Sequence, residues 1–155
     1  MLKSVSDFSF HTIGETVSPE IASEVIKIWT EFAGLDKAES QRRLVELIMV
    51  VKDGTGKIVG VSTAVKTFFP QIQNYVFAYR CFILPEFRAP ALDTQMIIRS
   101  KAHLHQISKS EAEKKCVGIM VVVQNEILKQ NWRQAVWRGA DMIYVGNTPK
   151  GDHMR

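Results

Sequence analysis

Hydrophobic positions change their spacing several times along the chain, and each change marks the start of a predicted element. A short apolar segment at 8–13 fits a strand. Apolar residues then recur every three or four positions, with Ser18 as a helix N-cap and Pro19 at the first helical position. This pattern predicts a helix that ends at Gly34.

The next segment predicts a short helix followed by three strands. Asp36 and Glu39 have the spacing of a capping box, so a second, shorter helix should start there. The apolar segments 47–51 and 57–66 flank an Asp-Gly turn signal and predict a hairpin. A long run of aromatic and branched residues, 75–84, predicts the third strand of this antiparallel set.

The last part of the chain alternates between helical and strand patterns. Residues 92–107 carry one apolar stripe at helical spacing, and 117–123 read as a buried strand. A further helix over 125–138 and a last short strand at 142–145 complete the predicted order, β-α-α-β-β-β-α-β-α-β. No repeat or linker interrupts this order, so we expect a single domain over residues 1–155.

Composition restricts the class of protein. With 155 residues and 46% apolar side chains, the chain can build a single core of ordinary size. No apolar run approaches the ~18 residues of a membrane span, and the first ten residues lack the apolar core of a signal peptide. We therefore expect a soluble, cytoplasmic protein without a membrane partner.

Charged and metal-binding side chains narrow the choice of partner. The net charge of +4 favours anionic partners, but the basic residues are scattered and form no stripe for nucleic acid. His103 and His105 stand two apart, which on a helix points them to different sides, and no metal-ligand pattern accompanies them. Cys81 and Cys116 lie in or beside apolar strands, so we expect buried thiols and neither a disulfide nor a metal site.

One stretch is a candidate for chemistry because a strand, a turn and a helix start follow one another directly. The sequence LPEFR at 84–88 ends the third main strand, and the helical pattern begins at Leu92. A helix N-terminus offers unpaired backbone N–H groups and the positive end of the helix dipole, and both suit a diphosphate. The turn therefore either binds a phosphate or only reverses the chain.

The LPEFR stretch is similar to a pattern, V-x-P-x-(F/Y)-R, that often ends a strand in the GNAT acyltransferase superfamily. The order of elements and the closing segment RGA at 138–140 also resemble that superfamily. The resemblance covers nearly the whole chain and rests on order more than on motifs. It implies a divergent member with an α/β (α+β) fold, in which helices flank a GNAT-like mixed central sheet.

The resemblance also implies a site for acetyl-CoA or another acyl-CoA as co-substrate. The pantetheine arm would lie between two splayed parallel strands, 75–84 and 117–123, and pair with backbone groups as an added strand does. The diphosphate would lie at the helix start. The implied donor-binding residues are Phe82, Ile83, Leu84, Arg88, Ala89, Ala91, Leu92, Asp93, Thr94 and Asn125.

The expected phosphate loop departs from the superfamily pattern (Q/R)-x-x-G-x-(G/A), because residues 88–93 keep the arginine and lack both glycines. Ala91 can replace a glycine if its φ is negative. Pro90 fits a first helical position but removes one N–H donor. Asp93 supports the helix but would repel a diphosphate on the same turn, and Arg88 partly screens this repulsion.

For catalysis, the resemblance implies a base that takes a proton from an amine and an acid that protonates the leaving thiolate. Many members use a tyrosine four residues before the glycine of a Gly-Phe pair, and counting back from Gly139 gives Ala135. Tyr144 is the candidate to replace that acid. Glu86 and Tyr79 are the candidates for the base, although a glutamate beside a turn is more often only solvated.

Three functions stay open at this point. The first is an N-acyltransferase that moves an acetyl or other acyl group from acyl-CoA, or from another thioester carrier, to an amine by direct attack. Its acceptor would be a small molecule or a protein. The second is a catalytically inactive binding or regulatory module of the same fold, motivated by Ala135 and Asp93. The third, nucleic-acid binding, rests only on net charge.

The tail of the chain bears on quaternary structure. Little sequence follows the strand expected at 142–145, whereas the superfamily's sheet usually closes with a further strand. We expect that strand to be truncated, missing or supplied by a second subunit, and the last arrangement would make a homodimer.

Overall fold

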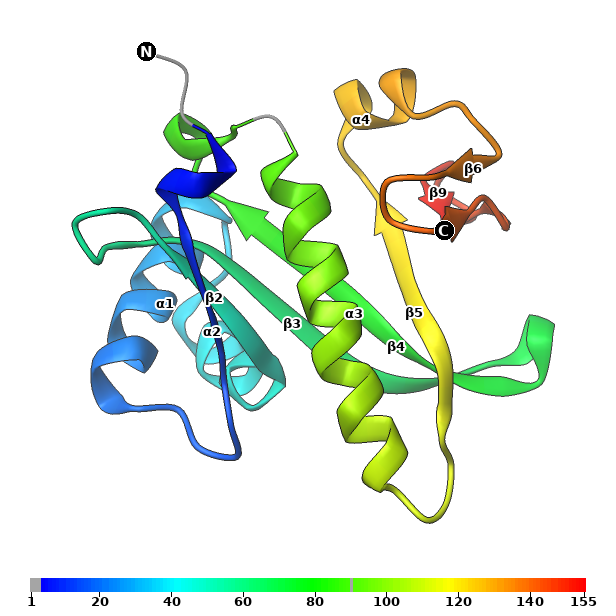
Figure 1. Ribbon diagram of the computed structural model, residues 1–155, viewed down its shortest axis with the longest axis horizontal. Helices are drawn as coiled ribbons and strands as arrows, with labels where there is room; N and C mark the ends of the chain where they lie inside the picture. The colour runs from blue at the N-terminus through cyan, green and yellow to red at the C-terminus, as the bar shows by residue number, and fades with distance from the viewer. Residues whose placement is uncertain (1–3, 90) are drawn as a thin grey trace.

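A central sheet forms the middle of the structure, and helices cover both of its faces (Figure 1). The computed structural model describes residues 4–89 and 91–155. Within these residues the sheet has seven strands in the order β1-β2-β3-β4-β5-β9-β8. Neighbouring strands are antiparallel except β4 and β5, which run parallel.

The helices and strands follow one another in the predicted order as far as β5. They are β1 (Ser9–Thr12), α1 (Pro19–Phe32), α2 (Lys37–Arg43), β2 (Leu47–Lys52), β3 (Ile58–Phe69), β4 (Asn74–Ile83), α3 (Leu92–Ser110), β5 (Cys116–Val123), α4 (Glu126–Asn131), β6 (Val136–Trp137), β7 (Met142–Ile143), β8 (Gly146–Asn147) and β9 (His153–Met154). Short 3-10 turns occur at η1 (Val5–Asp7), η2 (Leu44–Glu46), η3 (Pro70–Ile72) and η4 (Pro85–Phe87).

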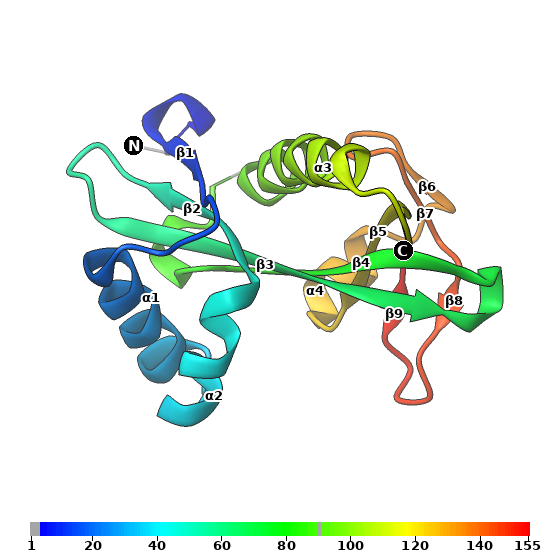
Figure 2. The same ribbon diagram turned by 90° about the horizontal axis from the view of Figure 1, so that it is seen from below.

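The two faces of the sheet carry different helices. α1 and α2 lie on one face and α3 lies on the other (Figure 2). On the α3 side, Tyr79 of β4 packs with Ile97 and Leu104. On the opposite side, Phe82 packs against a core cluster that contains Trp29. The predicted fold class, a mixed sheet flanked by helices, is confirmed. None of the described helices is long and apolar enough to span a membrane.

The segment 125–138 does not form one helix as predicted. α4 ends at Asn131, and the carbonyl oxygens of Trp132 and Gln134 accept hydrogen bonds from the Arg155 guanidinium. Carbonyl groups engaged in this way are not continuing a helix, because a helix would pair them with amides four residues further on.

The chain after α4 forms two small hairpins instead of one last strand. β6 pairs with β7, so the strand expected at 142–145 ends at Ile143 and lies outside the central sheet. β8 pairs with β9, and β9 pairs with β5. The same chain thus supplies the closing strand of the sheet, and the expectation that this strand was missing is wrong. A second subunit is therefore not needed to supply this strand.

Candidate functional site

β4 and β5 are paired along only part of their length. Over the described strands, the last paired residues are Tyr79 and Val121. Beyond them β4 stays paired with β3 as far as Ile83, while β5 pairs with β9 at Val122 and Val123. The two parallel strands therefore separate, as expected from the resemblance, and Figure 1 shows their ends pointing apart.

A cleft of about 1100 Å³ occupies the space where the strands separate. Its walls come from β4 and β5, from the turn before α3 and the start of that helix, and from residues of α1 and α4. The charged side chains that line it, among the described residues, are Arg43, Arg80, Arg88 and Asp93. Its aromatic lining residues are Trp29, Tyr79, Phe82, Trp132 and Trp137. The described residues contain no cluster of three or more His, Cys, Asp or Glu side chains that could hold a metal ion.

Most residues expected at a donor site line this cleft. They are Phe82, Ile83, Arg88, Ala89, Ala91, Asp93, Thr94 and Asn125. Leu84 and Leu92 instead belong to the core, with exposed fractions of 1% and 0%. The Leu84 N–H donates to the Val59 carbonyl oxygen at 2.9 Å, so this amide faces β3 and not the cleft. Pro90 lies outside the described residues.

The start of α3 contains a strained alanine. Ala91, the N-cap residue, has φ 63° and ψ 5°, which is the left-handed region. The condition under which alanine was expected to replace glycine without strain, a negative φ, is therefore not met. This conformation costs a residue with a Cβ atom about 1–2 kcal/mol, and glycine is the usual choice for it. The loop thus has a glycine-like backbone without a glycine, and such strain tends to persist at ligand-binding sites.

A carboxylate of α3 itself occupies one amide of its first turn. Asp93 Oδ1 accepts hydrogen bonds from the Thr94 backbone N–H at 2.7 Å and from Thr94 Oγ1 at 3.4 Å. Arg88 lies nearby, and its Nε donates to the Ile83 carbonyl oxygen at 3.4 Å. An anion that binds this turn would compete with Asp93 for the Thr94 amide, because first-turn amides are the donors available to a ligand.

The Tyr79 hydroxyl belongs to a buried polar cluster on the α3 side of the cleft. Ser100 Oγ donates to Tyr79 Oη at 3.4 Å and lies 3.2 Å from Ser62 Oγ, and all three residues are buried. Burial raises the pKa of Tyr79 well above its ordinary value, and the nearby Cys81 adds to this effect. The phenol therefore keeps its proton at neutral pH, so it can donate a hydrogen bond but cannot act as a base.

Cys81 is exposed, whereas the sequence predicted a buried thiol. It follows Tyr79 on β4 and lines the cleft, because β5 has already left its neighbour at this point. Although the side chain is accessible from the cleft, desolvation by the walls and then the Asp93 carboxylate raise the pKa of the thiol to about 12. At neutral pH Cys81 is a protonated thiol and not a nucleophile. Cys116, the other expected buried thiol, is half-buried.

The other candidates for catalysis lie elsewhere. Glu86 is exposed in η4, and Tyr144 is exposed and donates from its hydroxyl to Asn147 Oδ1 at 2.9 Å. Neither side chain is among the residues that line the cleft. Asn125 does line it, and its Oδ1 accepts from the amides of Ile127 and Leu128 at 2.9 and 3.1 Å. Asn125 is therefore a helix cap on the cleft wall.

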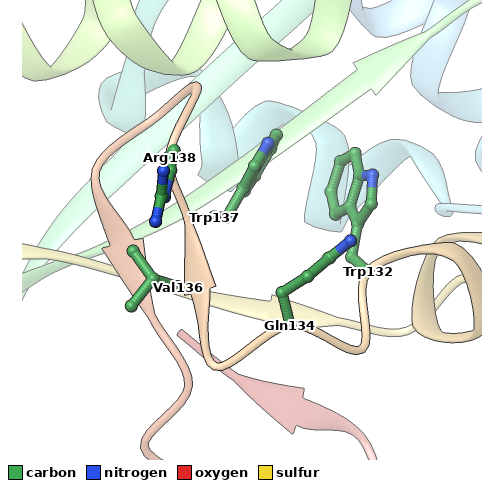
Figure 3. Close-up of a pocket in the computed structure, with 5 residues that line it drawn as sticks. All are labelled: Trp132, Gln134, Val136, Trp137 and Arg138. Atoms are coloured by element: carbon green, nitrogen blue, oxygen red, sulfur yellow. The ribbon is translucent and has the colours of Figure 1, made fainter.

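A second pocket of about 650 Å³ adjoins the cleft, and Figure 3 shows the five residues that line it. The rings of Trp132 and Trp137 have centroids 3.8 Å apart and planes inclined by 31°. Both tryptophans also line the cleft, so the two hollows share an aromatic wall. The sequence did not predict this wall, because one helix was expected over 125–138, and the two tryptophans were its only signal.

The sequence and the fold were both compared with those of known proteins. No family model and no curated protein matches the sequence. Solved structures do match. A ribosomal-protein-S5-alanine acetyltransferase from Vibrio fischeri superposes with a TM-score of 0.60 and 12% identity, over 99% of this chain and 93% of the other. A GNAT-family acetyltransferase from Listeria monocytogenes gives 0.54 and 18%, over 95% and 92%.

A third structure was solved with ligands. It is a mutant of the toxin AtaT bound to the C-terminus of the antitoxin AtaR and to acetyl-CoA, with a TM-score of 0.55 and 9% identity. It covers 96% of this chain and 92% of its own. The chain therefore has the GNAT fold, with the low identity of a divergent sequence.

Proposed function

We propose that this chain is an N-acyltransferase that moves an acetyl or similar acyl group from acyl-CoA to an amine by direct attack. The observation that carries the proposal is the cleft that opens where β4 and β5 separate, beside the first turn of α3. An extended pantetheine arm suits this gap because it can pair with the free strand edges as an added strand does. The fold is shared with acetyltransferases, which supports the same proposal.

Each wall of the cleft has a part in the proposed binding. Arg88 and the first-turn amides of α3 bind the diphosphate, since both are suited to an anion. Phe82 and Ile83 flank the arm on the β4 side, and Asn125 fixes the start of α4 on the β5 side. Asp93 weakens the phosphate site, because its carboxylate already accepts from the Thr94 amide.

In the proposed reaction the amine nitrogen attacks the thioester carbonyl carbon, the C–S bond breaks, and the thiolate leaves. The amine proton passes to solvent, and the thiolate takes up a proton from water. Tyr79 and Cys81 carry the proton-bearing groups on the α3 side of the cleft, and the Tyr79 hydroxyl is buried against Ser100, so neither is assigned a role in the proton transfers. Glu86 and Tyr144 have no role in this proposal because neither lines the cleft.

A second candidate function is a catalytically inactive module that keeps the fold and has lost the donor. Asp93 favours this candidate, because its carboxylate accepts a hydrogen bond from the Thr94 amide and lies where a phosphate would bind. Binding of the donor separates the two candidates.

The deciding experiment is calorimetric titration with acetyl-CoA, with acetyl-pantetheine, which lacks the diphosphate, as the probe of the phosphate contacts and desulfo-CoA as the probe of the thiol end. Thiol release is followed in parallel with an amine panel. The proposal predicts micromolar binding of acetyl-CoA that weakens when the diphosphate is removed, and weaker binding of acetyl-CoA in Arg88→Ala. Arg99→Ala is the matched control, because Arg99 is exposed on α3 and contacts the Phe10 ring outside the cleft. Absence of both heat and thiol release would favour the inactive module.

A further inference from the structure

The cleft also opens on the face of the sheet that carries α1 and α2. Trp29, Leu35 and Arg43 line it from that side. Successive side chains of a strand point to opposite faces, so Arg80 and Phe82 of β4 point toward α1 and α2, while Tyr79 and Cys81 point toward α3. The packing of Phe82 with the Trp29 cluster, and of Tyr79 with Ile97, agrees with this alternation.

A donor bound at the first turn of α3 that passes between the strands presents its thioester to the α1/α2 face. The acceptor amine then approaches from that face. The side chains there are therefore the ones that choose the acceptor.

Among the described residues, the charged side chains that line this face of the cleft are Arg43 and Arg80. Behind them lies an ion-pair network. Arg80 Nη1 lies 3.2 Å from Glu46 Oε2, and Arg43 Nε lies 2.6 Å from Glu39 Oε1. Arg42 contacts both glutamates, at 2.8 and 3.3 Å, but does not line the cleft.

The network holds three arginines against two glutamates, and the glutamates lie outside the lining of the cleft. The positive charge of the Arg43 and Arg80 guanidinium groups, and not the negative charge of the carboxylates that pair with them, therefore faces the acceptor. This charge repels cationic acceptors, and it favours the neutral form of an amine, which direct attack requires. A carboxylate, by contrast, matches the planar fork of a guanidinium.

We propose that the acceptor is a primary amine that also carries a carboxylate, such as an amino acid, and that Arg80 with Arg43 binds the carboxylate. Trp29, Leu35 and Phe82 offer apolar surface to the rest of the molecule. This inference rests on the proposed N-acyltransferase function and deepens it.

The test compares acceptors with and without the carboxylate at equal concentrations of the unprotonated amine, because conversion of the acid to its amide also lowers the pKa of the amine. Thiol release from acetyl-CoA is measured with phenylalanine against phenylalaninamide, with leucine against leucinamide, and with spermidine as a polycation. We expect kcat/KM to be higher for each acid than for its amide by about tenfold, since a hydrogen bond to a charged partner is lost in the amide. Spermidine should be the poorest acceptor.

Substitutions of the arginines in the ion-pair network test which of them causes the preference for acids. Arg80→Gln is expected to bring the rates for the acid and the amide within about twofold of each other. Arg43→Gln should have a weaker effect in the same direction. Arg42→Gln is the matched control, because it removes an arginine of the same network that does not line the cleft, and the preference for acids should persist. The comparison of acids and amides in the unmodified chain does not depend on how any variant folds.

The outcomes separate the two proposals. Transfer that favours the amides or spermidine, or a preference for acids that survives in Arg80→Gln, would overturn this inference and leave the N-acyltransferase in place. Binding of acetyl-CoA without transfer to either acid would also overturn it. If acetyl-CoA gives neither binding heat nor thiol release with any amine, the proposed function fails, and this inference fails with it.

Discussion

The Asp93 carboxylate accepts a hydrogen bond from the Thr94 backbone amide, 2.7 Å away, at the first turn of α3. A diphosphate needs this amide and is repelled by this charge. Asp93→Asn keeps an oxygen acceptor and removes the charge, so we expect CoA to bind about two- to fivefold more tightly, which corresponds to ~0.3–1 kcal/mol at a helix N-terminus. Calorimetric titration measures the change. Asp141→Asn is the control, because that side chain is 85% exposed and lies outside the cleft. Weaker binding in Asp93→Asn would rule out a phosphate site on this turn.

The left-handed backbone at Ala91 makes a prediction for stability. Glycine removes a strain of about 1–2 kcal/mol but loses more entropy on folding, by about 0.5–1 kcal/mol. Ala91→Gly should therefore raise the free energy of unfolding by about 0.5–1 kcal/mol, measured as a shift of the urea midpoint at constant m-value. Ala102→Gly, at an exposed position inside the same helix, should instead lower it by about 1 kcal/mol. Destabilisation by both changes would contradict the strained conformation.

The raised pKa of Cys81 predicts slow alkylation of an accessible thiol. Burial among the cleft walls and the Asp93 carboxylate raise this pKa to about 12, so little thiolate exists at pH 8. In a Cys116→Ser background, iodoacetamide should modify Cys81 at least about tenfold more slowly than a free thiol with a pKa of about 8.5. Mass spectrometry follows the reaction. Asp93→Asn should accelerate it, and acetyl-CoA should protect the thiol. A rate equal to that of the free thiol would contradict the raised pKa.

The ion pairs of Glu39 predict how stability depends on pH. Hydrogen bonds from Arg42 and then Arg43 lower the pKa of Glu39 to about 2. Because the folded pKa lies below the unfolded one, the stabilisation is fully present above about pH 4.5 and is lost as the pH falls toward 2. Glu39→Gln should therefore lower the urea midpoint at pH 6 slightly and leave it nearly unchanged at pH 2, since ion pairs at the surface are largely screened by solvent. Glu15→Gln, an exposed glutamate outside the network, should show no such difference.

The parts of the fold that the sequence predicted are those set by local chemistry. Ser18 Oγ accepts from the Ile21 amide at 3.3 Å, and Asp36 Oδ1 accepts from the Glu39 amide at 2.8 Å. Both helix starts could be predicted from the sequence because a cap and its helix are adjacent in the chain. The Asp-Gly turn between β2 and β3 could also be predicted, because its residues are neighbours in the sequence.

The parts that the sequence did not predict depend on distant contacts. The end of α4 depends on carbonyl groups bonded by Arg155, which is 23 residues beyond Trp132. The exposure of Cys81 depends on where β5 leaves β4, and no residue near Cys81 encodes that point. The positive φ of Ala91 contradicts the preference of its own residue type, so only the surrounding turn can impose it.

The pairing of β9 with β5 determines how the opening behaves. Val121 exchanges two backbone hydrogen bonds with Arg155, at 2.7 and 2.9 Å, so β5 keeps a partner on its outer edge where it leaves β4. The separation of the strands is therefore maintained by the chain's own hydrogen bonds, and its energetic cost is met during folding. A ligand that binds in the cleft does not have to separate the two strands. Its affinity is therefore higher than it would be if binding had to rearrange the sheet.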